Sequence, residues 1–314
     1  GLKTVYWCPH CETALAEAEI EYKDDKSFSI YVKFKSVDLS CHMPKGADPD
    51  KVFALIWTTT PWTIPCNVAI SANENFEYVW VRIGDEYLLM AKDLVDDYEV
   101  LPDVMTGKQL EGLVFKHPFY DRKVPIILGD HVTLEAGTGL VHTAPDHGQD
   151  DFDVCKKYAA WGLKPLGTVD GTGRYTDKVP GFEGQFVFDT NVPVIKKLAE
   201  LGALFAKSTF RHQYPHCWRC KEPIIYRATE QWFASVDGFR QKALDAIDTV
   251  KWIPSWGHDR IYNMIHDRGD WCISRQRVWG VPIPIFYCED CNEHLVNDDT
   301  INAVADLFAK EGSD

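Results

Sequence analysis

The sequence has no apolar run that approaches the roughly 18–20 residues needed to cross a bilayer. Its N-terminus lacks a basic stretch followed by an apolar one, and it has neither an internal repeat nor a low-complexity tract. We therefore expect a soluble, cytoplasmic globular protein without membrane contacts. Its 314 residues exceed the size at which one core usually stops growing, which predicts a main domain with smaller appended segments.

Positive charge is scarce. The chain has 33 Lys and Arg against 47 Asp and Glu, a net charge of −14, the opposite of a protein that grips nucleic acid through many phosphates. Any RNA contact must therefore be local. Two patches are candidates: one holds Arg211, His212, Gln213, Arg219 and Lys221, and the other is the stretch 268–277 with Trp271 and Trp279. A solvated charged surface beside core tryptophans explains them equally well.

The ten cysteines do not suggest a disulfide scaffold, because six of them form three Cys-x-x-Cys pairs in a long, enzyme-like chain. Such pairs favour metal binding in a reducing compartment. Four thiolates would complete a structural zinc site, and the first two pairs supply them: Cys8, Cys11, Cys217 and Cys220. The pairs lie far apart in the sequence, so their spacing alone leaves metal-free thiols open. No further pair follows Cys288 and Cys291, which predicts a half-site, either metal-free or helped by His294.

Short strands dominate the first half of the chain. Apolar residues alternate or cluster in several segments separated by turns rich in Gly, Pro, Asn and Asp: 26–35, 52–57, 77–83, 86–90, 124–128 and 139–143. Helical spacing occurs at 150–161, 192–204 and 239–247. This pattern favours an α+β, mainly β fold, with a β-barrel or meander and peripheral helices.

The composition of the sequence changes near residue 250, where a Trp/Arg-rich stretch begins. A short apolar strand is expected after it, at 281–287. We expect a β-barrel domain at 12–205. Residues 1–11 and 206–250 would form a zinc-knuckle stem, and 251–314 a third segment with the partial cysteine knuckle.

The most distinctive local feature is a strand that ends in three hydroxyls, Thr58, Thr59 and Thr60, just before two prolines. Prolines lack an N–H donor and hold the segment out of a regular helix, so these hydroxyls and the following backbone can line a fixed pocket. A threonine-rich edge strand that satisfies its own turn is an equally good interpretation of these residues alone.

A second feature runs from a strand through a Pro/Gly loop into a helix. His142 lies at the strand's end, while Asp150 and Asp151 lie in the first helical turn. A carboxylate there complements the helix dipole and is often only a cap. The same loop can also aim an imidazole and a carboxylate into one cleft, where the carboxylate would suit a substrate ammonium group.

Two stretches, TTTPWTIPCNVAIS and HTAPDHGQDDF, closely resemble the paired editing-site motifs of isoleucyl-tRNA synthetases. Three more are similar to that family: ALAEAEIEY, CWRCKEPIIYRATEQWF and DWCISRQRVWGVPIP, the last where the family's chain re-enters its catalytic fold. The sister valyl and leucyl enzymes typically carry Thr-x-Arg-Pro-Glu or Thr-x-Arg-Pro-Asp where this chain has Thr59-Thr60-Pro61-Trp62, so the resemblance favours the isoleucyl family. The His-x-Gly-His and Lys-Met-Ser-Lys-Ser signatures are missing, so ATP is expected only in the intact parent enzyme.

The resemblance implies hydrolysis of valine misattached to the acceptor end of tRNA(Ile), with valyl-adenylate as a second substrate and the rest of the synthetase as partner. It implies that Asp151 binds the α-ammonium of the amino acid. The pocket around the small side chain would be shaped by Thr58, Thr59, Thr60 and His142. Pocket walls or contacts to the terminal adenosine would come from Trp57, Trp62 and Asn67. It also supports one zinc shared by the first two cysteine pairs, and partner ligands further along the parent chain for the third pair.

Two rivals remain at this stage. One is the editing domain of a sister enzyme that acts on another small residue. The other is a zinc-ribbon module that binds RNA or protein without catalysis, for which the cysteine pairs alone would be sufficient.

Overall fold

The computed structural model describes residues 1–314 except 40, 41, 97, 278 and 314. Cys41 therefore lies outside the described residues, and so does Val278 of the motif DWCISRQRVWGVPIP. The chain forms two compact units, Gly1–Glu230 and Gln231–Asp314. None of the described helices is both long and apolar enough to span a membrane.

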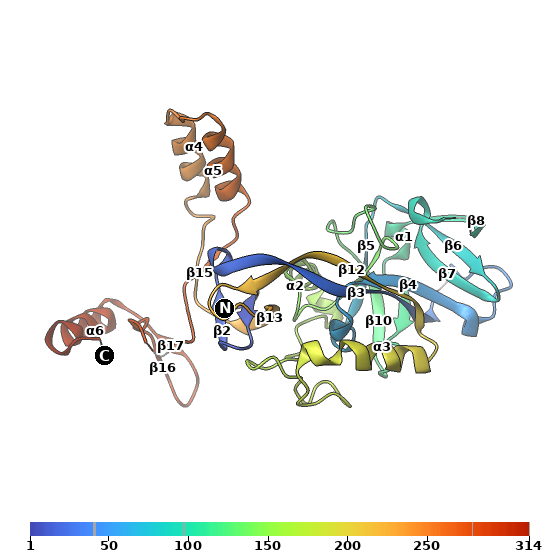
Figure 1. Ribbon diagram of the computed structural model, residues 1–314, viewed down its shortest axis with the longest axis horizontal. Coiled ribbons are helices and arrows are strands. Elements are labelled where there is room, and N and C mark those ends of the chain that lie inside the picture. The colour runs from blue at the N-terminus through green and yellow to red at the C-terminus, as the bar shows by residue number, and fades with distance from the viewer. Residues whose placement is uncertain (40–41, 97, 278, 314) are drawn as a thin grey trace. The chain divides into compact units, whose positions relative to one another are not determined.

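A mixed ten-stranded sheet dominates the first unit (Figure 1). Its order is β12-β3-β9-β10-β5-β11-β4-β7-β6-β8. The strands are β3 (Ile20–Asp38), β4 (Val52–Thr58), β5 (Ala69–Ala72), β6 (Glu77–Ile83), β7 (Glu86–Ala91), β8 (Glu99–Thr106), β9 (Val114–Lys116), β10 (Lys123–Leu128), β11 (Leu140–Thr143) and β12 (Leu204–Cys217). Six of the strand predictions made above fall on these elements.

An additional pairing between β3 and β4 closes part of this order on itself. Strands β3, β9, β10, β5, β11 and β4 thereby form a circuit in which each strand pairs with the next. Side chains alternate across it: Ile30, Val32 and Phe34 are fully buried opposite Thr58, Ile56 and Ala54. This alternation places one face of the β3–β4 pair in the core.

A three-stranded sheet, β13-β1-β2, forms the second β element of this unit. It joins the chain's start to a much later segment: β1 (Leu2–Cys8), β2 (Thr13–Leu15) and β13 (Ile225–Glu230). We call this sheet the stem. Six residue pairs align β1 with β13, which brings the first and second Cys-x-x-Cys pairs of the sequence, residues 8–11 and 217–220, to one end of the stem.

The helices of the first unit are shorter than the sequence predicted. They are α1 (Gly107–Leu110), α2 (Gln149–Lys157) and α3 (Asn191–Glu200). The prediction of a helix through residue 204 was wrong, because Gly202 adopts a left-handed conformation (φ 67°) that ends the helix, and Leu204 already begins β12. Likewise α2 ends at Lys157 and a short 3₁₀ turn, Ala159–Trp161, follows it.

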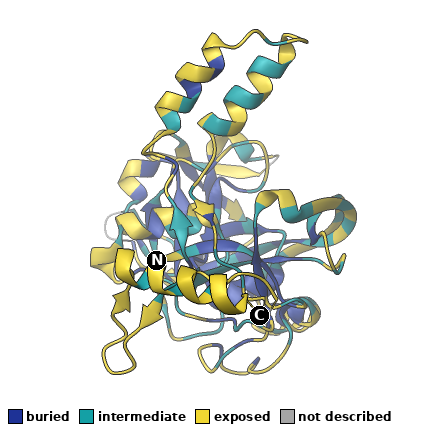
Figure 2. Cartoon of the chain, turned by 90° about the vertical axis from the view of Figure 1, so that its left-hand side faces the viewer, coloured by how far each residue is buried: buried dark blue, intermediate teal, exposed yellow. Residues whose placement is uncertain are grey.

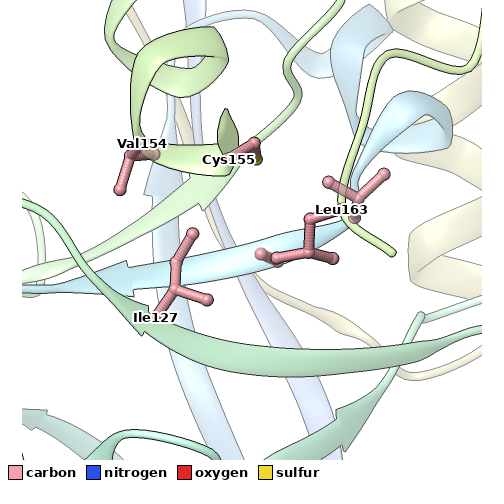
Figure 3. Close-up of a cluster of buried hydrophobic side chains, with 6 residues drawn as sticks. Ile127, Val154, Cys155 and Leu163 are labelled. Carbon is pink, nitrogen blue, oxygen red and sulfur yellow. The ribbon is translucent and has the colours of Figure 1, made fainter. Parts of the chain in front are cut away.

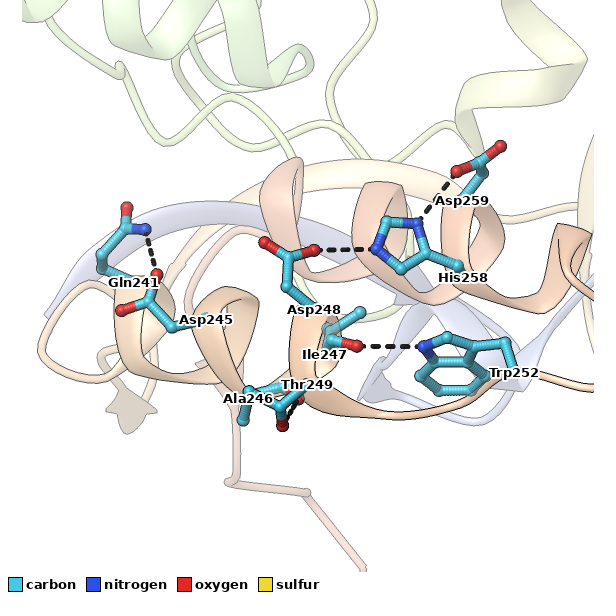
Figure 4. A network of polar contacts seen from close by, with 9 residues as sticks. All are labelled: Gln241, Asp245, Ala246, Ile247, Asp248, Thr249, Trp252, His258 and Asp259. Carbon is cyan, nitrogen blue, oxygen red and sulfur yellow. Dashed lines mark hydrogen bonds and ion pairs between the residues drawn. The ribbon is translucent and has the colours of Figure 1, made fainter.

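The second unit contains a helical hairpin, α4 (Arg240–Thr249) and α5 (Trp256–His266), a C-terminal helix α6 (Asp298–Glu311), and two short strand pairs. His258 bridges the hairpin by contacting Asp248 at 2.8 Å and Asp259 at 3.0 Å (Figure 4). Figure 2 shows how little of this unit is buried, and α6 has no buried residue. The pairs are β14 (Phe233–Ala234) with β15 (Trp271–Cys272), and β16 (Phe286–Tyr287) with β17 (His294–Leu295).

Two expectations for this region need correction. The unit begins at Gln231, about 20 residues before the change in composition, because β14 pairs with β15 and so ties 233–272 together. The strand expected at 281–287 is reduced to Phe286–Tyr287, since Pro282 and Pro284 cannot donate hydrogen bonds to a ladder.

Candidate functional site

The two motifs meet where two parallel strands end. Strand β4 ends at Thr58, β11 ends at Thr143, and Val141 pairs in parallel with Trp57. Strand β5 pairs with β11 on its other side, with Ile70 opposite His142. The carboxyl ends of β4 and β11 therefore lie at one edge, and the segments that follow both leave from it.

A chain of hydroxyls connects the threonine segment to His142. The Oγ1 atoms of Thr58 and Thr60 are 3.2 Å apart, and those of Thr60 and Thr63 are 3.1 Å apart. Thr63 Oγ1 then lies 2.9 Å from His142 Nε2. Thr63 is placed by the 3₁₀ helix η3 (Pro61–Cys66), where its N–H donates to the carbonyl of Thr60. The hydroxyls of Thr58, Thr60 and Thr63 thus form one hydrogen-bonded network with His142.

His142 is held from both sides and stays neutral. Its Nδ1 lies 2.8 Å from Asn67 Nδ2, which can only donate, so Nδ1 accepts and Nε2 carries the proton toward Thr63. Burial lowers the pKa of His142 to about 3, with a smaller contribution from His147. An imidazole with both nitrogens engaged is suited to shaping a pocket and not to accepting a proton.

Sequence reasoning missed Thr63, although it is the fourth threonine of the same motif and only 5% exposed. It also left two roles open for Asn67. The structure buries Asn67 completely and uses its amide to hold His142 and to donate to Ala69 O at 2.8 Å. Of the two roles, support of the pocket wall is the one that suits this position.

Asp151 lies in the first turn of α2, half-buried, and does not cap the free amides of its own helix. Its Oδ2 accepts a hydrogen bond from the backbone N–H of Ala144 at 2.8 Å, one residue after β11. Its Oδ1 accepts none from the described residues. Burial raises the pKa of Asp151 to about 7, against the lowering effect of the Ala144 hydrogen bond. A cation at Oδ1 would compensate this carboxylate for the water it has lost.

Two features fix where α2 presents this carboxylate. Val154 and Cys155 pack against Ile127 of β10 and Leu163 in a buried cluster with Val68 and Ala69 (Figure 3). On the other side, Gly148 leaves space for the carboxyl group, since a Cβ there would lie 2.9 Å from Asp151 Cγ and Oδ2. The helix is therefore seated by apolar contacts and its first turn is kept open by a glycine.

A cavity of about 190 Å³ opens beside the threonines. Thr59, Thr60 and Trp62 line it, together with residues of β3, β12 and α3 such as Phe28, Tyr214 and Asn191. The described residues that line this cavity do not include Thr58, His142 or Asp151. Trp57 faces elsewhere: its indole donates to Ser29 Oγ at 2.8 Å. The predicted site residues thus divide into a buried network and a cavity wall, with Asp151 beside the β11 end.

The four cysteines of the first two pairs come together. Their sulfur atoms all lie within 4.8 Å of one another, and Cys8 Sγ is 3.4 Å from Cys220 Sγ. A tetrahedral zinc with bonds of about 2.3 Å needs sulfur separations of roughly 3.8 Å, so this donor set fits such an ion. Cys288 and Cys291 are exposed, and among the described residues His294 does not complete a three-ligand group with them.

The stem is bonded directly to the loop that leads into α2. Ala228 N donates to Asp146 O at 2.8 Å, His147 Nδ1 lies 2.9 Å from Tyr226 O, and Thr4 Oγ1 donates to Pro145 O. The Asp146 carboxylate in turn accepts from Leu166 N and Gly167 N. The cysteine cluster at the end of the stem and the Asp151 loop therefore share one rigid support.

A model of the family described as tRNA synthetases class I (I, L, M and V) matches residues 1–314. The chain belongs to this family. Among curated class I relatives, it is 56% identical over 323 positions to the isoleucine–tRNA ligase of Syntrophomonas wolfei subsp. wolfei and 56% over 324 to that of Thermoanaerobacter sp. strain X514. Each match covers all of this chain and 34% of the relative, so the chain spans about a third of their length. The predicted resemblance to isoleucyl-tRNA synthetases is confirmed.

Solved structures with similarity to this class I chain include the crystal structure titled GlLeuRS-CP1, with a TM-score of 0.45 and 14% identity over 57% of this chain and 99% of that one. A second is the P. knowlesi cytosolic leucyl-tRNA synthetase editing domain, with a TM-score of 0.42 and 11% identity over 63% of this chain and 99% of that one.

Proposed function

We propose that this chain is the editing domain of an isoleucyl-tRNA synthetase and hydrolyses valine from the acceptor end of valyl-tRNA(Ile), with valyl-adenylate as a second substrate. The observation that carries the proposal is Asp151. Its carboxylate has one oxygen fixed by Ala144 and one left for a cation, beside the strand ends that bear Thr58 and His142. The circuit of six paired strands supports the β-barrel that the resemblance implies.

In this reaction a water oxygen attacks the ester carbonyl carbon, the bond to the ribose oxygen breaks, and the ribose hydroxyl leaves with a proton. Asp151 would hold the α-ammonium of the amino acid, while the hydroxyls of Thr59 and Thr60 orient the ester in their cavity. Rate enhancement then comes from orientation and polar stabilisation. Cys66 does not act as a nucleophile, because it is fully buried and burial raises the pKa of its thiol.

The need for such a site follows from the small difference between valine and isoleucine. One methylene in a hydrophobic pocket is worth about 1–3 kcal/mol, and isoleucyl enzymes are the usual example of this limit. A second pocket that admits valine and excludes isoleucine removes the errors that the first pocket makes. Its partners would be tRNA(Ile) and the rest of the synthetase, which also uses ATP, in the cytoplasm where proteins are made.

The four clustered cysteines would hold one structural zinc. The ion would supply cross-linking of β1 to the β12–β13 turn and no chemistry at the ester, since four sulfur ligands leave no open position. Cys288 and Cys291 would need ligands from elsewhere in the parent enzyme.

The direct test of the ammonium anchor is Asp151→Asn. The amide keeps an oxygen that accepts from Ala144 N but removes the charge, so the loss is a charge-assisted contact of about 1.5–3 kcal/mol. Hydrolysis of valyl-tRNA(Ile) should fall about 10- to 150-fold at an unchanged melting temperature. The exposed neighbour provides the control, and Asp150→Asn should change neither quantity. Near-wild-type hydrolysis by Asp151→Asn would reject this role.

Two rival functions make different forecasts. A sister enzyme's editing domain would hydrolyse another misacylated tRNA faster than valyl-tRNA(Ile). A non-catalytic zinc-ribbon module would hydrolyse none, and its binding would depend on metal and be indifferent to Asp151.

A further inference from the structure

A second hollow lies on the first unit and shares no lining residue with the threonine cavity. Its volume is about 690 Å³, and it is formed by β3 and β4, the loop 116–121 and the end of α3. The described residues that line this hollow include none of the proposed site residues Thr58, Thr59, Thr60, His142 and Asp151. The proposed hydrolysis leaves this hollow without a role.

Five lysines line the hollow in a chain whose net charge is −14: Lys33, Lys35, Lys51, Lys116 and Lys197. Three carboxylates line it as well: Asp50, Glu86 and Asp121. Only Lys33 is firmly committed to an acid. It is 10% exposed and lies 2.7 Å from both carboxylate oxygens of Glu86. Each of the next three pairs with a carboxylate that is at least 75% exposed: Asp50, Asp85 and Asp121. Such exposed pairs contribute little to stability, so an anion can replace the carboxylate at little cost.

Lys197 differs from the other four, because it pairs with no carboxylate among the described residues. Its Nζ lies over aromatic rings, 4.9 Å from the centroid of Phe119 and 5.3 Å from that of Phe182. The Phe119 and Tyr120 rings are themselves half-exposed and line the hollow. A full positive charge is therefore held in place beside flat apolar surfaces, and its charge is left for a ligand.

Ammonium groups beside aromatic rings fit a ligand that has both a phosphate and a planar base. The volume is within the range of about 300–1,000 Å³ usual for sites that enclose such molecules. We propose that this hollow binds a nucleotide, with its phosphate at Lys197, Lys116 and Lys35 and its base against Phe119 or Tyr120. The nucleotide is either free or one unit of a bound RNA strand.

The second source is supported by the register of the sheet. Ile30 pairs with Thr58 and Lys35 pairs with Phe53, five residues further along β3. At about 3.4 Å per residue this separates Lys35 from the threonines by roughly 17 Å. An RNA strand that ends at the threonines can therefore place an earlier unit in the hollow.

The test measures binding of AMP to the full chain by calorimetry, with adenosine and inorganic phosphate titrated separately. Lys197→Ala should weaken AMP binding at least tenfold, and Lys197→Arg should restore most of it because a guanidinium keeps the charge over the rings. Lys196→Ala is the matched control: it removes an exposed lysine of the same helix that does not line the hollow, and should change nothing. Lys116→Ala, a second and exposed position, guards against a folding effect of Lys197→Ala.

Uncharged tRNA(Ile) distinguishes the two sources. If Lys197→Ala and Lys116→Ala weaken its binding as well, the hollow takes a unit of the RNA; if they weaken AMP binding alone, it takes a free nucleotide. No aminoacyl ester is present, so the result does not depend on the proposed hydrolysis. Unchanged binding of both AMP and tRNA in both variants, or an equal loss in Lys196→Ala, would overturn the proposal.

Discussion

The threonines of the motif have two roles: some support a hydrogen-bonded network, and some line the cavity. Thr58 and Thr63 are buried, and Thr60 links them in the network that ends at His142. Thr59 and Thr60 line the cavity. A hydroxyl that is already bonded to its neighbours has a fixed direction, which lets the next one offer its oxygen to a ligand in a defined geometry. The three hydroxyls that the sequence grouped together thus act as a support and a wall.

His142→Ala tests whether this network is a scaffold. The change leaves Thr63 Oγ1 and Asn67 Nδ2 with one partner fewer in the core, which should cost about 1–3 kcal/mol of the free energy of unfolding. Denaturant unfolding measures this loss, and Thr63→Val should show a similar one. Since burial keeps His142 neutral down to a pKa of about 3, the pH profile of the remaining hydrolysis should match the wild type between pH 6 and 8. Loss of a limb in that range would identify His142 as a base instead.

At the scale of elements, α2 and the stem decide where the carboxylate stands. Apolar packing fixes the helix against β5 and β10, and backbone hydrogen bonds fix its preceding loop against β1 and β13. Neither contact involves the Asp151 side chain. A substitution at another residue can therefore displace the Asp151 carboxylate while Asp151 itself is kept.

Gly148→Ala makes that change. The added Cβ would lie 2.9 Å from the Asp151 carboxyl group, and the flexible side chain should rotate away and lose its alignment. Gly148 has an extended backbone (φ −153°) that alanine also adopts, so the melting temperature should change little. Hydrolysis of valyl-tRNA(Ile) should fall at least tenfold. Gly171→Ala is the control, because its Cβ would make only an ordinary 3.5 Å contact with Trp7. Equal activity of the two variants would show that the carboxylate tolerates displacement.

Cys217→Ser tests the stem. Protein prepared without chelator should contain one zinc per chain, and loss of one thiolate should release it and lower the melting temperature, by about 2–4 °C for each kcal/mol lost. Some hydrolysis should survive at low temperature, because the site residues remain. Cys291→Ser, outside the cluster, is the matched control and should keep the metal. A wild-type chain without metal would contradict the assignment.

The sequence predicted the type of most elements, because periodicity reports which face of a strand or helix is buried. It failed at boundaries such as Gly202, where one backbone conformation overrides a continuing apolar pattern. It could not show that Cys8 meets Cys217, or that Thr63 meets His142, since both contacts depend on which distant strands pair. The site residues were grouped by their resemblance to the family's motifs, and not by any contact that the sequence could predict.

At the scale of the whole molecule, the first unit holds the threonines, His142, Asp151 and the cysteine cluster, all before residue 231. The chain corresponds to about a third of each isoleucine–tRNA ligase that it matches. Neither ATP signature of the class I enzymes occurs in its sequence. The activity that we propose for this chain, at the ester of an already charged tRNA, requires neither signature.

The most direct measurement compares the hydrolysis of valyl-tRNA(Ile) and isoleucyl-tRNA(Ile) by this chain at equal concentrations. A cavity of about 190 Å³ beside Thr59 and Thr60 should accept the smaller side chain and exclude the larger one. We predict multiple turnovers of valyl-tRNA(Ile), at least tenfold faster than any release of isoleucine, which is the discrimination that one methylene allows. Equal rates for the two esters, or no hydrolysis above the spontaneous rate, would contradict the account.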